Sequence, residues 1–113
     1  MLARWAGWGA VPQVFDEDAD RFAAERTELR ALLGTEDAWA QARRTTLNAH
    51  YTSATVVASM WRAVEGLGFD GTGRVLEPGC GSGNFIGFAP PGASLTGIEL
   101  DRKTAEIARQ LYG

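Results

Sequence analysis

The chain has 113 residues, of which 45% are hydrophobic and 22% are charged, and its formal net charge is −3 at pH 7. This length suits one domain or a part of one, and the composition is that of a globular protein rather than a disordered one. The slight acidity leaves no basic footprint for nucleic-acid binding in the chain itself. Because the one cysteine excludes an internal disulfide and no apolar run reaches membrane-spanning length, we expect a cytoplasmic protein without a membrane partner.

Residues 1–15 combine large apolar side chains with helix breakers. The apolar members are Trp5, Trp8, Val11 and Phe15. Glycine and proline at this density exclude a long helix, whereas aromatic rings are costly to leave in water. Two interpretations stay open: this arm covers the core of its own domain, or it docks onto a further domain.

Two helices are predicted after the arm. Asp16 is the expected N-cap of the first, and Gly34 is expected to end it. Its apolar positions recur at helical spacing: Phe22, Leu29, Leu32 and Leu33. Thr35 is the expected N-cap of the second helix, which presents Trp39 and Leu47 on its apolar side. The adjacent pair Arg43 and Arg44 is typical of a solvated helix face, with contact to a phosphate as the alternative.

A third helix has the strongest amphipathic pattern in the chain. Thr52 or Ser53 is its expected cap. Its apolar stripe consists of Val56, Val57, Met60, Trp61, Val64 and Leu67. We expect this stripe to pack on the sheet that follows, with Gly66 near the helix end.

The stretch RVLEPGCGSGNF, Arg74–Phe85, is a short strand followed by a glycine loop. The loop contains three glycines, Gly79, Gly81 and Gly83. Glycine permits positive φ and leaves no Cβ between the loop amides and a ligand. A second strand is predicted over Leu95–Leu100, with Glu99 near its end. A carboxylate ~20 residues after such a loop suits a nucleoside with a vicinal diol.

The connection between the two strands is short. Asn84–Ala89 allows about a turn and a half of helix before Pro90, which cannot continue it. Asp101 is the expected cap of a last helix, which turns Ile107 and Leu111 inward and Arg102 and Lys103 outward. Two parallel strands bury too little surface to stand alone. We therefore predict an α/β chain whose N-terminal helices precede the first βαβα part of a Rossmann-like fold, with an incomplete sheet.

The domain organisation follows from this pattern. Residues 1–48 are predicted to form the aromatic arm and a helical segment. Residues 49–113 are predicted to form the first, truncated part of a cofactor-binding domain.

The glycine loop differs from a dinucleotide fingerprint in two ways. Asn84 stands where the third glycine would be, and Glu77-Pro78 directly precedes the loop. A carboxylate repels a diphosphate but attracts an ammonium or sulfonium group. Both features favour S-adenosylmethionine, which has an α-amino group, a sulfonium and a ribose diol.

VLEPGCGSGNF followed by LTGIELD resembles the first two cofactor motifs of S-adenosylmethionine-dependent DNA adenine-N6 methyltransferases of restriction–modification systems. In that family a Tyr/Phe-Thr-Pro turn opens the preceding helix, and AHYTSATVV, Ala49–Val57, occupies this place with Ser53 instead of proline. WGAVPQVFDE and TTLNAHYTS are similar to segments of large helicase–methylase fusion proteins of plasmids, phages and phage-defence loci. The resemblance covers Trp5–Tyr112.

The resemblance implies a set of S-adenosylmethionine contacts. Tyr51 and Thr52 would hold or cover the methionine carboxylate, with an aromatic plug and an N-cap as the structural alternative. Glu77 and the loop of Gly79, Cys80, Gly81 and Gly83 would take the amino-acid moiety. Glu99 would accept the ribose hydroxyls and Leu100 would lie against adenine. Phe85 would shape the pocket wall, with core packing as its alternative. Cys80 is a small loop residue without a nucleophilic role, and the lone His50 predicts no metal site.

The family's catalytic Asp/Asn-Pro-Pro-Tyr/Phe motif, which holds a flipped-out adenine, does not occur in this sequence. We therefore expect no catalytic residue in this chain, and interpret it as the cofactor-binding front of a larger methyltransferase. Its partners would be DNA, the remainder of the methyltransferase domain and a helicase domain. Two alternatives stay open: a non-catalytic S-adenosylmethionine-binding or interaction module, and a methyltransferase acting on RNA, protein or a small molecule.

Overall fold

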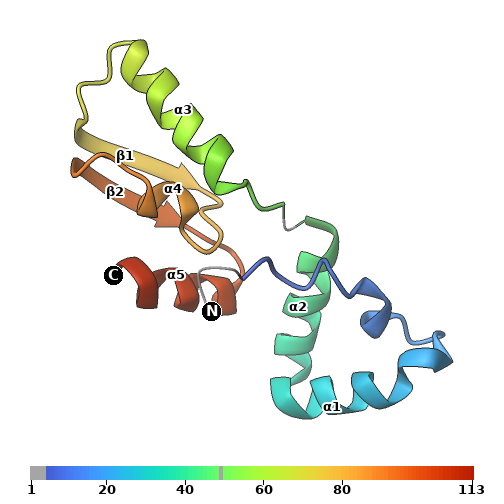
Figure 1. Ribbon diagram of the computed structural model, residues 1–113. Helices are drawn as coiled ribbons and strands as arrows, with labels where there is room; N and C mark the ends of the chain where they lie inside the picture. Colours follow the sequence, from blue (N-terminus) through green and yellow to red (C-terminus); the bar gives the residue numbers. More distant parts are fainter. Residues whose placement is uncertain (1–4, 49) are drawn as a thin grey trace. The chain divides into compact units, whose positions relative to one another are not determined.

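The computed structural model describes residues 5–48 and 50–113 (Figure 1). Contacts divide them into two compact units: a helical unit, Ala6–His50, and an α/β unit made of Trp5 and Tyr51–Gly113. Residues 1–4 and 49, which include the first residues of the predicted arm and of the predicted cofactor-binding part, lie outside the described residues. The mixture of helices with a parallel sheet agrees with the predicted α/β class.

The helical unit has its own small core. Its elements are two 3-10 turns, Pro12–Phe15 and Asp20–Phe22, followed by α1, Ala23–Leu33, and α2, Glu36–Asn48. The buried cluster consists of Val14, Phe15, Trp39 and Ala42, with Trp8, Phe22, Leu29 and Leu33 packed against it. The rings of Phe15 and Trp39 lie 4.7 Å apart. Part of the aromatic arm therefore covers the core of its own unit, which is the first of the two interpretations.

The start of the first helix was predicted wrongly. The Asp16 carboxylate accepts a hydrogen bond from the Asp18 amide at 3.1 Å, and α1 begins only at Ala23. The Arg26 guanidinium explains the delay, because it donates to the backbone carbonyls of Asp16 and Ala19. An arginine side chain that binds these carbonyls holds the segment in turns, and a sequence pattern does not reveal such a partner.

The junction between α1 and α2 agrees with the prediction. Gly34 ends α1 with a φ of 76°, and the Ala38 amide donates to the Thr35 hydroxyl at 3.1 Å. Two leucines predicted on the apolar faces do not pack: Leu32 and Leu47 are each 77% exposed. Both lie near the C-terminal end of their helix, outside the buried cluster.

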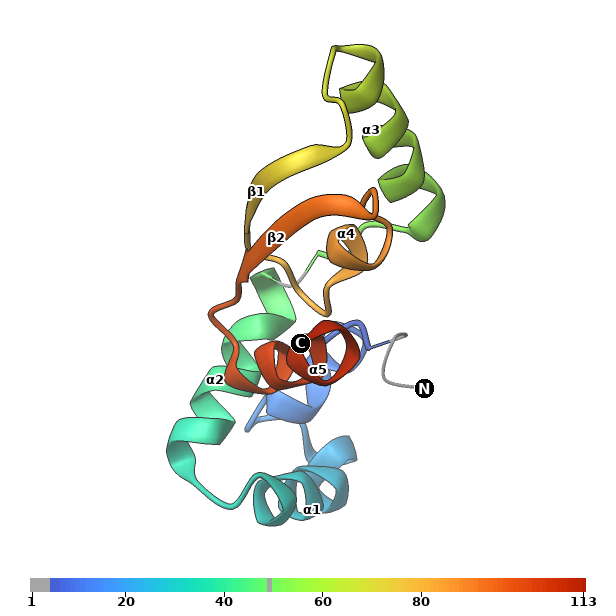
Figure 2. The same cartoon turned by 90° about the vertical axis from the view of Figure 1, so that its left-hand side faces the viewer.

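The α/β unit has two parallel strands. Its elements are α3, Ala54–Gly66; β1, Thr72–Pro78; α4, Asn84–Gly87; β2, Gly92–Ile98; and α5, Arg102–Tyr112. Val75 pairs with Leu95 in the parallel register, and Figure 2 shows the strands side by side. The short crossover helix agrees with the prediction. The second strand ends at Ile98 rather than Leu100, so Glu99 follows the strand instead of lying within it.

The apolar stripe of α3 packs only in part. Val57 and Trp61 are buried, and the Trp61 indole N–H donates to the Phe85 carbonyl at 3.0 Å, which joins α3 to α4. The remaining members of the stripe stay 42% to 89% exposed: Val56, Met60, Val64 and Leu67. The prediction that the whole stripe packs on the sheet is therefore wrong, because a sheet of two strands is too narrow to cover it.

The last helix is capped as predicted. The Asp101 carboxylate accepts from the Thr104 amide at 2.8 Å. Thr104 and Ala108 are the buried residues of α5, while Ile107 and Leu111 are half-buried. No helix within the described ranges is both long and apolar enough to cross a membrane.

Candidate functional site

The glycine loop follows β1 and is anchored on the end of β2. All three of its glycines have positive φ: Gly79 at 76°, Gly81 at 55° and Gly83 at 90°. The amides of Gly79 and Cys80 donate to the Ile98 carbonyl at 2.7 Å and 2.9 Å. The loop conformation therefore depends on glycine and lies at the carboxyl ends of both strands, where α/β proteins bind ligands.

Glu99, which directly follows β2, forms a hydrogen bond with the glycine loop. One of its carboxylate oxygens accepts from the Gly81 amide at 2.9 Å, and the other accepts from the Asp101 amide at 2.8 Å. A carboxylate has about four lone-pair sites, so two further hydrogen bonds can be accepted. The structure thus brings together the glycine loop and the acidic residue that the sequence paired, and it leaves acceptor capacity on Glu99.

Tyr51 lies on the same loop. A Cβ built on Gly81 would be 3.1 Å from Cε1 of the Tyr51 ring, so only glycine allows this contact without a shift. Burial raises the pKa of Tyr51 above its ordinary value of 10.0, which keeps the phenol protonated near neutral pH. Thr52 also reaches the loop region, through its backbone carbonyl, which accepts from the Asn84 side-chain amide at 3.0 Å. The predicted turn is therefore beside the glycine loop.

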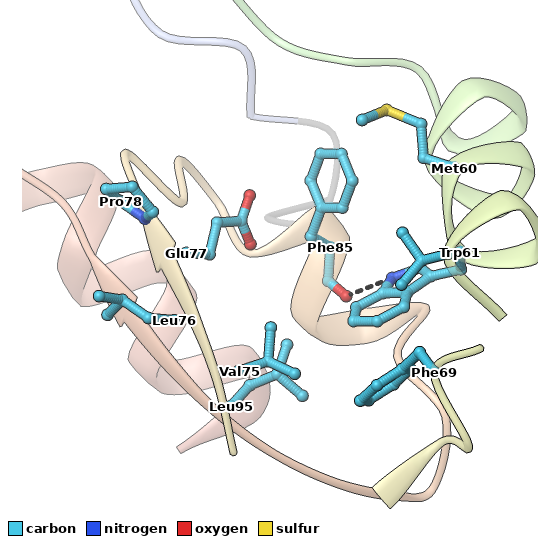
Figure 3. A pocket seen from close by; sticks show the side chains of 10 residues that line it. Met60, Trp61, Phe69, Val75, Leu76, Glu77, Pro78, Phe85 and Leu95 are labelled. Atoms are coloured by element: carbon cyan, nitrogen blue, oxygen red, sulfur yellow. Dashed lines mark hydrogen bonds between the residues drawn. The ribbon is translucent and has the colours of Figure 1, made fainter. Parts of the chain in front are cut away.

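Glu77 points from β1 into an apolar cavity, as Figure 3 shows. Its Oε2 is buried and has no hydrogen-bond partner among the described residues. Burial raises the pKa of Glu77 from 4.5 to about 7. Removing a carboxylate from water without a partner is costly, and a cationic or hydrogen-bonding group beside Glu77 would reduce that cost.

The cavity around Glu77 has a volume of about 290 Å³. Its lining residues come from α3, the connection between α3 and β1, both strands and α4: Met60, Trp61, Val64, Phe69, Val75, Leu76, Pro78, Phe85 and Leu95. Phe85 forms part of the wall of this cavity. An apolar cavity with one polar group has the usual composition of a small-molecule site.

Cys80 and Leu100 do not add chemistry in this geometry. Cys80 is buried, and burial together with the charges of Glu99 and Glu77 raises its pKa, so the thiol stays protonated. A protonated, buried thiol is a poor nucleophile. Leu100 follows Glu99 directly and is 86% exposed. It can therefore offer an apolar surface beside Glu99.

Sequence reasoning missed three residues of this region. A Cβ on Gly97 would lie 2.7 Å from the Cys80 sulfur, so close packing of the loop on β2 requires glycine there. The Tyr112 ring approaches Gly83 in the same way, at 2.6 Å from an ideal Cβ. Thr104 is buried beside Asp101. Only Thr104 has a local signal, its position three residues after the capping Asp101.

Within the described part of the chain, no group of three or more His, Cys, Asp or Glu side chains is arranged to hold a metal ion. Comparison with family models, curated proteins and solved structures finds no match to this chain. The geometry of the site is therefore the basis for a functional proposal.

Proposed function

We propose that the α/β unit binds S-adenosylmethionine and is the cofactor-binding front of a Rossmann-like DNA adenine-N6 methyltransferase. Glu77 would meet the cationic methionine end, and the glycine loop would face the amino-acid moiety. Glu99 would accept the ribose hydroxyls, with Leu100 against adenine. Tyr51 and Thr52 would cover the methionine carboxylate. When bound, S-adenosylmethionine supplies a methyl group that a positioned amine can take directly.

The observation that carries this proposal is the buried Oε2 of Glu77, which has no hydrogen-bond partner among the described residues. A buried carboxylate without a hydrogen bond reduces stability, and such perturbed groups concentrate at functional sites. A ligand with an ammonium or sulfonium group would satisfy it, whereas a diphosphate would be repelled. The donor set thus fits a nucleoside with a cationic tail and disfavours a dinucleotide.

The position of Glu99 supports the nucleoside part. Its two oxygens each have one backbone donor and retain acceptor capacity. A vicinal diol offers two O–H donors to one carboxylate, which is how doubly wound dinucleotide-binding folds hold a ribose. The same carboxylate accepts the hydrogen bond of the Gly81 amide. Binding of a ribose diol by Glu99 would therefore depend on the conformation of the glycine loop.

The acceptor of the methyl group rests on the sequence resemblance alone, with RNA, protein or a small molecule as alternatives to DNA adenine. A second candidate is a non-catalytic S-adenosylmethionine-binding module. The absence of a Pro-Pro-Tyr/Phe motif from this sequence favours it for the chain by itself. Both candidates require the same cofactor site, so cofactor binding is the first property to test.

Isothermal titration calorimetry with S-adenosylmethionine and with adenosine tests the proposal. Glu77→Gln is expected to weaken S-adenosylmethionine binding by about tenfold or more and to leave adenosine binding unchanged, because adenosine has no cation. Glu99→Gln is expected to weaken both ligands, because both have the ribose diol.

Glu65→Gln is the matched control, since Glu65 is an exposed glutamate of α3 in the same unit. Its affinities should equal those of the wild type. A folded wild-type chain that binds neither ligand would overturn the proposal. Equal losses for both ligands in Glu77→Gln would show that Glu77 does not face the cationic end.

A further inference from the structure

The side chain of Asn84 bonds to a segment that lies far from it in the sequence. Asn84 is the first residue of α4, and its side-chain amide donates a hydrogen bond to the Thr52 backbone carbonyl at 3.0 Å. The two residues are 32 positions apart along the chain. A carbonyl oxygen can only accept, so the Asn84 atom that faces it is the amide nitrogen. Asn84 therefore links the segment before α3 to the end of the glycine loop.

Helix capping does not explain this bond. Gly83 is the N-cap residue of α4, and no side chain of the described residues caps that end. The N-cap residue of α3, Ser53, likewise forms no side-chain cap among the described residues. Asparagine side chains usually bind backbone groups close to them in sequence. The Asn84 amide instead makes a tertiary contact.

A second hydrogen bond fixes α3 itself on α4. The Trp61 indole N–H donates to the Phe85 carbonyl at 3.0 Å (Figure 3), and Phe85 directly follows Asn84. Two consecutive residues thus bind the segment before α3 and α3 itself, through one hydrogen bond each. Because the Trp61 bond already joins the two helices, the Asn84 bond adds a separate restraint on the segment around Thr52.

The segment that Asn84 holds lies on the glycine loop. Tyr51 directly precedes Thr52, and its Cε1 is 3.1 Å from an ideal Cβ on Gly81. Residues 51–53 are described by the structure and belong to no helix or strand. A segment without regular backbone hydrogen bonds keeps its position through tertiary contacts such as these. The Asn84 bond and the Tyr51 ring therefore restrain the same short segment against the loop.

The place of Asn84 in the loop motif gives this bond a consequence for ligand choice. A dinucleotide fingerprint has its third glycine at this position, and glycine has no side chain to donate to the Thr52 carbonyl. Under the proposed function, Tyr51 and Thr52 cover the methionine carboxylate, whereas Glu99 accepts the ribose hydroxyls. The Asn84 bond therefore acts on the part of the site that would hold the amino-acid tail.

We propose that Asn84 is a positioning residue that holds the segment of Tyr51 and Thr52 over the glycine loop, and that it thereby favours a nucleoside with an amino-acid tail over one without. The preference for this ligand rests on the proposed function above. The positioning rests on the contacts of Asn84 and Tyr51 alone.

Nuclear magnetic resonance tests the positioning without a ligand. A nuclear Overhauser effect between the Tyr51 ring protons and the Gly81 α-protons reports their contact. Asn84→Ala removes the donor, whereas Asn84→Asp keeps the size of the side chain and places an oxygen against the carbonyl. The effect should weaken in Asn84→Ala and at least as much in Asn84→Asp. If Asn84 only filled space, Asn84→Asp would resemble the wild type and Asn84→Ala would not; that order, or no change in either variant, overturns the proposal.

Calorimetry with S-adenosyl-L-homocysteine and with adenosine tests the ligand preference. Asn84→Ala is expected to raise Kd for S-adenosyl-L-homocysteine about tenfold and Kd for adenosine by less than about threefold. Equal losses for the two ligands would show a general effect on the fold and would refute the preference. Gln41→Ala is the control, because the Gln41 amide donates to the Asp37 carboxylate on the exposed side of α2, at 2.8 Å. Its affinities should equal those of the wild type.

The wild type keeps the test decisive if neither Asn84 variant folds. S-adenosyl-L-homocysteine should slow the exchange of the Asn84 side-chain amide protons with solvent, and adenosine should not. The same exchange rates with both ligands overturn the proposal. If the wild type binds neither ligand, the proposed function fails, and the Tyr51–Gly81 contact in the two variants still decides the positioning role of Asn84.

Discussion

Replacing Glu77 by glutamine is expected to increase the stability of the fold near pH 8. The same replacement is expected to lower the affinity for S-adenosylmethionine, the proposed ligand. Glu77 has a buried Oε2 without a partner in the described part of the chain. Burial raises its pKa from 4.5 to about 7. Because the pKa is higher in the folded protein than in the unfolded chain, stability is greatest below about pH 4.5 and falls as pH rises to about 7.

The magnitude follows from the two pKa values. The difference between 4.5 and about 7 corresponds to at most about 3.4 kcal/mol, at ~1.36 kcal/mol per pKa unit. The side chain is only partly buried, and solvent screening reduces the effect to about 1–2 kcal/mol. Glutamine stays neutral at every pH, so Glu77→Gln should match the wild type near pH 5 and exceed its stability by about 1–2 kcal/mol near pH 8.

Urea unfolding followed by far-ultraviolet circular dichroism at about pH 5 and about pH 8 measures this difference. The exposed Glu65→Gln variant is the control and should differ from the wild type by less than about 0.5 kcal/mol at both pH values. An equal effect of Glu77→Gln at both pH values would refute the argument, since it would show that ionisation of Glu77 does not affect folding. A gain in stability joined to a loss of affinity is the pattern expected for a functional carboxylate.

Three further substitutions test the fold. Gly97→Ala is expected to cost about 1–3 kcal/mol, because the new methyl group would lie 2.7 Å from the Cys80 sulfur; wild-type stability in urea would contradict this. Gly66→Ala is its counterpart, since a Cβ there meets no atom within 4 Å among the described residues; a gain of about 0.5–1 kcal/mol is expected, and a loss would be inconsistent with open space. Thr35→Ala removes the acceptor of the Ala38 amide and should cost the helical unit about 1 kcal/mol, measured by thermal unfolding; an unchanged midpoint would count against the cap.

Local signals in the sequence were sufficient to predict the boundaries of several helices. Gly34 and Thr35 mark the junction of α1 and α2, and Asp101 marks the start of α5, because caps involve residues within one turn of each other. The same holds for the glycine loop, where positive φ is a property of single residues. The start of α1 was missed because Arg26 binds carbonyls of a distant turn.

The candidate site also has a part that the sequence predicts and a part that only the structure reveals. The sequence by itself determined the loop of Gly79, Gly81 and Gly83 and its pairing with Glu99, because the end of one strand and the end of the next must meet in a parallel sheet. Only the tertiary structure decided that Glu77 faces a cavity in which its Oε2 meets no hydrogen-bond partner from the described parts of the chain.

The contacts of Thr104 belong to the tertiary structure as well. Its partner Trp5 lies far from it along the chain, and a Cβ on Gly97 would lie against the Cys80 sulfur. No periodicity or local propensity encodes which distant side chains meet, because that depends on how the helices, strands and loop pack together. The sequence therefore determined the chemistry of the loop, and packing decided which groups surround it.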